Sequence, residues 1–244
     1  MAAELAVATY NIHRAVGTDG VCDLGRIATV LREVDAAIVG VQEIDCHAVD
    51  NPSGNQLERL AELTQMHGVA GPLVRRQDVS TGNGILSRFP VLERRWIDLS
   101  VKSREPRGAL DVDLETPFGP LRVVNTHLGL RYGERNRQIE LLFAAVDGKT
   151  PTVVLGDFNE WRWRAATLLR LQGAYAGTPP LRSFPARRPF LALDRVYVHP
   201  REALVGAQVV ATETARRASD HLPLRAILKL ALPPLGVLQT ESRT

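Results

Sequence analysis

The 244-residue sequence predicts an α/β fold in which two packed β-sheets are covered on the outside by helices. About ten segments have the composition and periodicity of strands, and fewer have helical periodicity. Many of the strands follow one another in hairpin-like pairs, and residues 69–128 contain no predicted helix. Because a purely parallel sheet needs a crossover, usually a helix, between successive strands, this stretch excludes that arrangement. Two sheets with helices outside bury every apolar face.

The bulk composition is that of one globular domain with a sizeable core. Hydrophobic residues make up 45% of the chain, and a chain of this length buries roughly three-quarters of its unfolded surface. No apolar stretch approaches the ~20 residues that span a bilayer, so no stable membrane insertion is expected. The N-terminus shows neither a charged leader nor a cleavage site, and Cys22 and Cys46 are too few for a disulfide framework. We expect a monomer in a reducing cytoplasm.

The charge of the chain is carried by arginine. The net charge is +3, with 27 Arg and 3 Lys. Guanidinium groups match phosphate oxygens in pairs, which favours an anionic substrate, although codon bias in a GC-rich genome also explains the excess. A charge of +3 falls far short of a strong nucleic-acid footprint.

The first part of the chain alternates strands and helices. Asp23 can cap the first helix, and Gly68 closes the second. The expected elements are a strand at 5–13, a helix at 24–34, a strand at 36–44, a loop at 46–55 and a helix at 55–68.

The rest of the chain is mostly strands. A single domain over 1–230 and a frayed tail over 231–244 complete the expected organisation. The strands are expected at 68–76, 82–88, 93–100, 109–116, 121–130, 152–159, 191–200, 204–212 and 221–232, with helices at 135–148 and 160–173 and a long Pro/Arg-rich loop at 174–190.

The stretch TVVLGDFNE, residues 152–160, is the most informative in the sequence. A buried strand ends there and releases Asp157 and Asn159, and strand periodicity puts both side chains on the same side. A carboxylate and a carboxamide at the end of a buried strand occupy a position where α/β folds place their chemistry. A tight turn with Asn as a helix cap is the alternative.

Strand after strand ends in an acid, an amide or an imidazole. One such residue indicates a turn or a cap, but many of the same chemical kind predict one convergent site. The residues are Asn11, Glu43, Asn83, His127, Asp157, Asn159, Asp194, Asp220 and His221.

Seven short motifs carry a resemblance to a known family. In order they are TYNI (9–12), QEI (42–44), GNGILSR (82–88), NTHL (125–128), GDFN (156–159), LDRVYV (193–198) and SDHLP (219–223). The sequence resembles the endonuclease/exonuclease/phosphatase superfamily of deoxyribonuclease-I-like, metal-dependent phosphoesterases. The resemblance implies a four-layer α/β/β/α sandwich with two mainly antiparallel sheets and a divalent metal at one mouth.

The resemblance implies a metal site at Glu43 with Asn11 beside it. These side chains and water offer hard oxygen ligands, which suit Mg²⁺ or Mn²⁺ rather than zinc. Asp220 either contacts a second metal or structures its turn.

The resemblance also implies the catalytic residues. Asp194 orients His221, whose other nitrogen faces the scissile phosphate. Asp157 and His221 compete for the role of general base, Asn159 stabilises the phosphate oxyanion, and His127 contributes a proton or charge to the leaving oxygen.

Two further residues are candidates for binding the substrate phosphate. Asn83 follows a glycine in GNG, where a type I′ turn is the alternative. Arg107 can reach a phosphate oxygen, and an ordinary exposed arginine is the alternative.

The predicted function is a divalent-metal-dependent phosphoester hydrolase that uses in-line attack of water. A phosphodiesterase or phosphatase acting on a small or lipid-derived phosphoester ranks first. A nonspecific Mg²⁺-dependent nuclease ranks second, and an inactive binding module last. The loops at 47–55, 128–137 and 160–190 are expected to select the substrate, and Trp161 and Trp163 either stack on a base, rest on lipid or are buried by their own helix.

Overall fold

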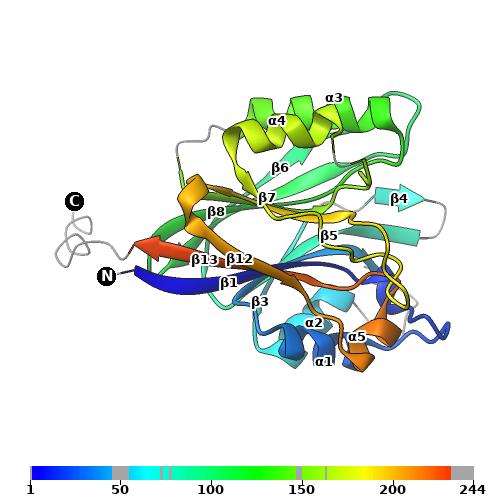
Figure 1. The fold of residues 1–244 in the computed structure, drawn as a ribbon. Helices are drawn as coiled ribbons and strands as arrows, with labels where there is room; N and C mark the ends of the chain where they lie inside the picture. Colours follow the sequence, from blue (N-terminus) through cyan, green and yellow to red (C-terminus); the bar gives the residue numbers. More distant parts are fainter. Residues whose placement is uncertain are drawn as a thin grey trace.

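The computed structural model describes residues 2–45, 55–71, 74–76, 79–146, 150–162 and 164–231. Two sheets pack face to face with helices on both outer sides, as predicted (Figure 1). Within each sheet one neighbouring pair of strands is parallel, β1 with β2 and β8 with β9, and the other pairs are antiparallel.

The first sheet has the strand order β12-β13-β1-β2-β5-β3, with β4 also paired to β5. Its strands are β1 (Ala2–Asn11), β2 (Ile38–Asp45), β3 (His67–Ala70), β4 (Val74–Arg76), β5 (Val79–Ser87), β12 (Leu204–Val209) and β13 (Leu224–Ala231). Its outer face is covered by α1 (Leu24–Val34), α2 (Gln56–Thr64) and α5 (Glu213–Ala218) (Figure 1).

The second sheet has the order β10-β11-β9-β8-β7-β6. Its strands are β6 (Val91–Asp98), β7 (Gly108–Thr116), β8 (Gly119–His127), β9 (Thr152–Asp157), β10 (Ala176–Gly177) and β11 (Asp194–His199). The helices α3 (Tyr132–Ala145) and α4 (Ala166–Ala174) cover its outer face, and short 3₁₀ turns lie at His13–Ala15 and Arg201–Ala203 (Figure 1).

Three apolar layers hold the sandwich together. One lies between the first sheet and its helices, one between the two sheets, and one between the second sheet and α3 and α4. Alternation along each strand separates the layers: in β1, Val7 faces the other sheet while Ala8 and Tyr10 face the helices. Burial of this apolar area is the main force that stabilises the fold.

The structure corrects three predicted helix boundaries. The helix predicted at 55–68 ends at Thr64, and Gly68 lies in β3 instead of closing the helix. The predicted helix at 160–173 begins only at Ala166, because Glu160 is buried beneath the surface and Asn159 has a positive φ of 50°. Trp161 therefore lies before the helix and is 61% exposed, so its own helix does not bury it. The helix predicted from residue 135 begins at Tyr132, so most of the 128–137 segment is helix rather than loop.

Other differences are smaller. The six-residue helix α5 was not predicted; Thr212 caps it by accepting a hydrogen bond from the Ala215 amide. Strand β13 reaches Ala231, one residue into the predicted tail. The remainder of that tail, most of the 47–55 loop and Trp163 lie outside the described residues.

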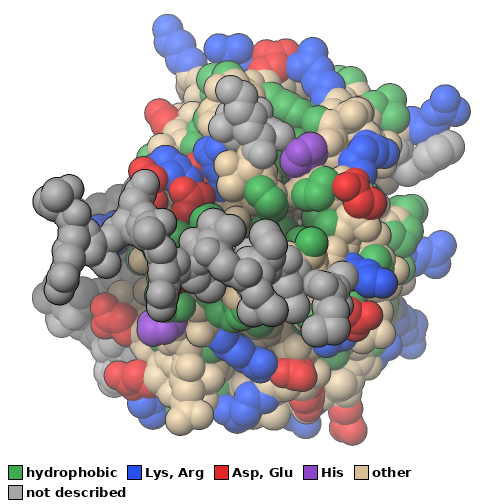
Figure 2. Space-filling model, turned by 90° about the vertical axis from the view of Figure 1, so that its left-hand side faces the viewer, with side chains coloured by type: hydrophobic (Ala, Val, Ile, Leu, Met, Phe, Trp, Pro, Cys, Tyr) green, Lys and Arg blue, Asp and Glu red, His purple; other side chains and the backbone are tan. Residues whose placement is uncertain are grey.

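No helix in the described ranges is long and apolar enough to cross a membrane. Figure 2 shows the end of the sandwich that carries both termini, with apolar side chains near its middle and charged side chains around its edge. A hollow of about 260 Å³ there is lined by residues that include Phe118, Leu121 and Leu230. Strand β8 runs from this end to His127, roughly 26 Å away.

Candidate functional site

The polar strand ends converge because they extend inward-facing rows of the strands. In β9, Val153 and Leu155 lie in the apolar layer between the sheets, and Asp157 is the next residue of that row. The same alternation brings the other inward-facing polar residues to this mouth of the sandwich: Asn11 of β1, His127 of β8 and Asp194 of β11. Polar groups thus replace apolar ones where the layer between the sheets opens.

Glu43 reaches the same mouth by way of a β-bulge. Val39 and Val41 face the helices, and strict alternation would send Glu43 to that side as well. The register of β2 against β5 shifts between Val41 and Ile44, and Glu43 has a φ of 54°. A bulge re-aims a side chain, and here it turns the carboxylate toward Asn11.

Asn11 joins two carboxylates. Its Nδ2 donates to Glu43 Oε1 at 3.0 Å and to Asp157 Oδ2 at 3.2 Å. Its Oδ1 accepts from the His13 backbone amide at 3.0 Å. Residues 11, 43 and 157, far apart in the sequence, therefore form one cluster.

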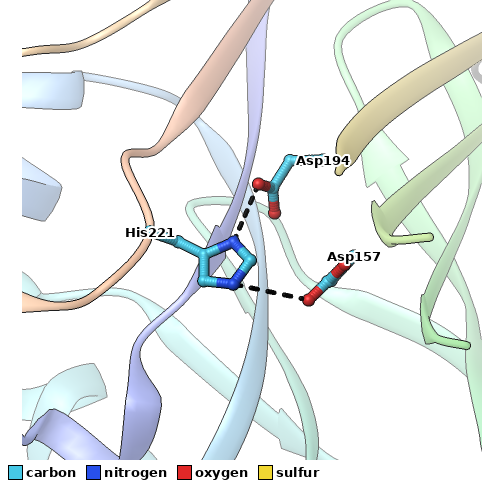
Figure 3. Close-up of side chains that lie close together, drawn as sticks. All are labelled: Asp157, Asp194 and His221. Atoms are coloured by element: carbon cyan, nitrogen blue, oxygen red, sulfur yellow. Dashed lines mark hydrogen bonds and ion pairs between the residues drawn. The ribbon is translucent and has the colours of Figure 1, made fainter. Parts of the chain in front are cut away.

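His221 lies between two carboxylates (Figure 3). Its Nδ1 is 2.9 Å from Asp194 Oδ2, and its Nε2 is 3.7 Å from Asp157 Oδ2. The Ser183 hydroxyl also donates to Asp194 Oδ2, and the Phe184 ring packs against the imidazole with 4.8 Å between ring centroids. The ring is held from three sides.

The two histidines of the site have opposite charge preferences. Burial would lower the pKa of His221, but the carboxylates of Asp194, Asp157 and Asp220 outweigh it and raise that pKa to about 10. Burial lowers the pKa of His127 to about 3, against the opposing effect of Asp157. At neutral pH, His221 is an imidazolium and His127 a neutral imidazole.

Asn159 and His127 lie together beside Asp157. The Asn159 side-chain amide donates to His127 Nε2 at 3.1 Å and to the Leu128 carbonyl at 2.9 Å. The Asn159 backbone amide donates to Asp157 Oδ1 at 2.9 Å. Strand β9 ends at Asp157, so this turn, rather than strand alternation, directs Asn159 into the site.

The remaining predicted residues lie as follows. Asn83 is buried within β5, not in a turn, and donates to the Gly108 carbonyl at 3.1 Å. Arg107 pairs with Glu105 at 3.0 Å and lowers the pKa of His127 through its charge. Asp220 is half-buried, with Oδ1 4.0 Å from His13 Nδ1.

The sequence reasoning missed a buried network that fixes the two sheets beneath the site. Gln42 Nε2 donates to Asn125 Oδ1 at 2.6 Å and to Thr9 Oγ1 at 3.0 Å. The Asn125 amide donates to the backbone carbonyls of Val41 and Gly84, which pair with each other across β2 and β5 next to the bulge. Gln42 and Asn125 stand inside the QEI and NTHL motifs, which was the available signal.

Two serines were also missed. Ser219 donates to the Asn11 carbonyl at 2.7 Å and stands inside the SDHLP motif. Ser183, which supports Asp194, lies in the long loop after α4, where no sequence pattern distinguishes it.

A buried ion pair holds the rim next to Asn159. Arg135 Nη2 lies 2.8 Å from Glu160 Oε2, with side chains 3% and 0% exposed, and Arg135 also donates to the Gly129 and Leu130 carbonyls. The rim residues thus fixed expose apolar side chains to solvent: Leu130 (73%), Tyr132 (39%) and Trp161 (61%).

The donor set fits a divalent cation with a preference for oxygen. The carboxylates of Glu43 and Asp157 lie on the same Asn11 amide nitrogen, so both carboxylates are brought next to one another at this mouth. Hard oxygen ligands of this kind suit Mg²⁺ and Mn²⁺. Asp157, Asp194 and His221 also bring ligand atoms within 4.8 Å of one another, but His221 Nδ1 is already bonded to Asp194.

Known proteins resemble this chain over most of its length. YbhP of Escherichia coli strain K12, an uncharacterized protein, is 32% identical, with 92% of this chain and 96% of YbhP covered. The crystal structure of an endonuclease/exonuclease/phosphatase from Beutenbergia cavernae has a TM-score of 0.77 at 26% identity, with coverage of 93% of this chain and 72% of that one. A family protein from Bacteroides thetaiotaomicron has a TM-score of 0.79 at 19% identity, covering 95% and 100%.

These likenesses confirm the predicted four-layer sandwich and the resemblance read from the motifs. The model of the endonuclease/exonuclease/phosphatase family matches residues 8–221, which include every predicted site residue. Members of this family are phosphoesterases, phosphatases or nucleases. The chain belongs to the endonuclease/exonuclease/phosphatase family.

Proposed function

We propose that the protein is a divalent-metal-dependent phosphoester hydrolase in which water attacks the phosphorus in line. The observation that carries the proposal is the meeting, at one mouth, of the Glu43–Asn11–Asp157 cluster with the Asp194–His221 pair. A bound Mg²⁺ or Mn²⁺ would supply Lewis-acid polarisation and neutralise charge on the phosphoester.

Glu43 is the proposed principal ligand of the metal. Asn11 presents its amide nitrogen to the carboxylates, so its amide oxygen becomes a metal ligand only when the side-chain amide rotates by half a turn. Asp220 stays a candidate for a second metal.

The remaining roles follow from charge. His221 carries a proton at neutral pH and can hold an anionic phosphate oxygen, while Asp194 fixes its tautomer and orientation. That leaves Asp157, whose carboxylate lies next to both histidines, as the group that aligns the water and accepts its proton. Asn159 and neutral His127 can contribute hydrogen bonds rather than charge.

The apolar rim supports a substrate whose organic part is apolar. Leu130, Tyr132 and Trp161 are exposed on the two segments that the Arg135–Glu160 pair joins, and the Arg162 guanidinium lies 4.1 Å from the Tyr132 ring centroid. An aliphatic side chain at the most exposed position favours a small or lipid-derived phosphoester over a polynucleotide. Asn83 and Arg107 remain candidates for further contacts to the phosphate.

The experiment is a hydrolysis assay with bis-p-nitrophenyl phosphate, phospholipid headgroup release and plasmid nicking, each with Mg²⁺, with Mn²⁺ and with EDTA. We expect metal-dependent turnover of the first two, and loss of turnover by orders of magnitude in Glu43→Gln and Asp157→Asn. Glu58→Gln, which changes an exposed carboxylate in the first turn of α2, is the control and should keep full activity. Turnover that persists in EDTA, or in Glu43→Gln, would refute the proposal, and plasmid nicking alone would overturn the substrate class.

A further inference from the structure

Arg195 is a buried cation that the candidate site does not use. It follows Asp194 on β11, and strand alternation places its side chain on the opposite face, toward α4. The residue is only 3% exposed. Its hydrogen bond is a long one, from Nη1 to the Pro179 carbonyl at 3.5 Å, and within the described ranges no carboxylate lies at salt-bridge distance.

Arg195 lines a cavity whose other walls come from α4, from residues 178–180 after β10, and from β11, on the side of the second sheet that faces α4. The cavity has a volume of about 580 Å³, within the range of small-molecule sites. Its lining combines hydrogen-bonding side chains with apolar ones: Gln172, Thr178, Arg195 and Tyr197 with Leu168 and Pro180.

A lone buried charge is costly unless something compensates it. Burial lowers the pKa of Arg195, with partial compensation from Tyr197 first and then from Asp194 and Glu160, none of which lies at salt-bridge distance. Arginine nonetheless stays protonated in proteins, so the charge cannot be relieved by losing a proton. A cavity beside such a charge is where a counter-anion gains the most.

We propose that this cavity binds a small organic anion whose phosphate or carboxylate group pairs with Arg195. The planar fork of the guanidinium fits either group through two parallel hydrogen bonds. Thr178, Gln172 and Tyr197 offer further polar contacts, and Leu168 and Pro180 pack against the organic part. The site lies on the outer face of the second sheet, whereas the candidate catalytic site opens between the sheets.

The test measures anion binding to the full chain in EDTA. Inorganic phosphate and succinate are titrated separately, at an ionic strength held constant with chloride, and followed by calorimetry and by the thermal unfolding midpoint. Because the proposed catalytic site also attracts phosphate, the titrations are repeated in His221→Asn. We expect saturable binding of at least one probe in His221→Asn, weakened at least tenfold when Arg195→Gln is added.

Two further variants serve as controls. Arg195→Lys keeps the charge but loses the planar fork of the guanidinium, so we expect it to bind the anion with intermediate affinity. If Arg195→Gln does not fold, Arg195→Lys takes its place in the test. Arg59→Gln removes an exposed arginine on α2 and should bind as the parent does. Binding unchanged by both Arg195 substitutions, or absent from His221→Asn, would overturn the proposal. If the protein binds the anion but shows no hydrolase activity, the proposed function is refuted and the anion site is not.

Discussion

Two histidines that contact the same carboxylate oxygen show how burial and neighbouring charges can set opposite protonation states at one site. His127 Nε2 and His221 Nε2 lie 3.5 Å and 3.7 Å from the same oxygen, Asp157 Oδ2. His221 also contacts Asp194, and the added carboxylate decides the outcome. Both imidazoles are buried, so the one with two carboxylate neighbours is charged and the one with a single carboxylate neighbour is neutral.

Replacing Asp194 with Asn should lower kcat by about 10²–10⁴, because the Nδ1 partner of His221 becomes a neutral amide that fixes neither tautomer nor charge. The measurement is metal-dependent hydrolysis of bis-p-nitrophenyl phosphate across pH. A Ser183→Ala variant, which removes only the second hydrogen bond to Asp194, should lose far less. Equal losses in both variants would show that Asp194 serves the fold and not the imidazole.

The stability of the metal-free protein should respond to pH in opposite ways through the two histidines. For His221, the pKa rises from about 6.5 unfolded to about 10 folded, so its contribution is full below pH 6.5 and disappears as the pH rises toward 10. For His127, the folded pKa of about 3 is below the unfolded value, so stability is lost as the pH falls from 6.5 toward 3.

Urea unfolding of the parent, His221→Gln and His127→Gln in EDTA measures both effects. The stability difference between the parent and His221→Gln should shrink between pH 6.5 and 10. The acid-side loss below pH 6.5 should be smaller in His127→Gln than in the parent. Parallel pH curves for all three proteins would contradict the assigned charge states.

At the scale of elements, the Arg135–Glu160 pair explains why α4 starts late and the rim is fixed. The sequence 160–173 has helical composition, yet Glu160 is fully buried and committed to Arg135, whose fork also holds the Gly129 and Leu130 carbonyls. A tertiary ion pair thus overrides local propensity. Nothing in the local pattern reports a partner 25 residues away.

Glu160→Gln should destabilise the protein by about 3–5 kcal/mol, because it leaves the Arg135 charge buried without its counter-ion. Equilibrium unfolding in urea measures the change. The matched control, Glu62→Gln, breaks an exposed pair with Arg59 and should cost less than about 1 kcal/mol. Similar losses in the two variants would rule out a buried, uncompensated charge.

The end of β9 depends on a glycine. A Cβ on Gly156 would lie 1.9 Å from the Thr126 carbonyl oxygen of the neighbouring strand, and the residue has a φ of 149°. Gly156→Ala should therefore cost about 2 kcal/mol or more and displace Asp157. In contrast, Gly173→Ala, in the exposed part of α4 with open space around it, should gain about 0.5–1 kcal/mol. Thermal unfolding compares them, and a neutral Gly156→Ala would contradict this packing.

At the scale of the whole molecule, the architecture could be predicted from the sequence more completely than the individual contacts could. The absence of crossover helices in 69–128 and the alternation within strands were enough to predict two packed sheets. The polar residues at the strand ends were enough to predict that such side chains meet at one mouth of the sandwich. The bulge that turns Glu43 inward was not predictable, since strict alternation sends it outward. Support of Asp194 by Ser183 depends on how a long loop closes, which no periodicity encodes.

The central claim is that one mouth of the sandwich holds a divalent metal and a phosphate at the same time. Crystals soaked with Mn²⁺ and phosphate test it directly through the anomalous signal of the metal. We predict Mn²⁺ coordinated by the Glu43 carboxylate, with a phosphate between it and the side chains of His221 and Asn159. Mn²⁺ bound away from Glu43, or phosphate found without contact to His221, would contradict the account.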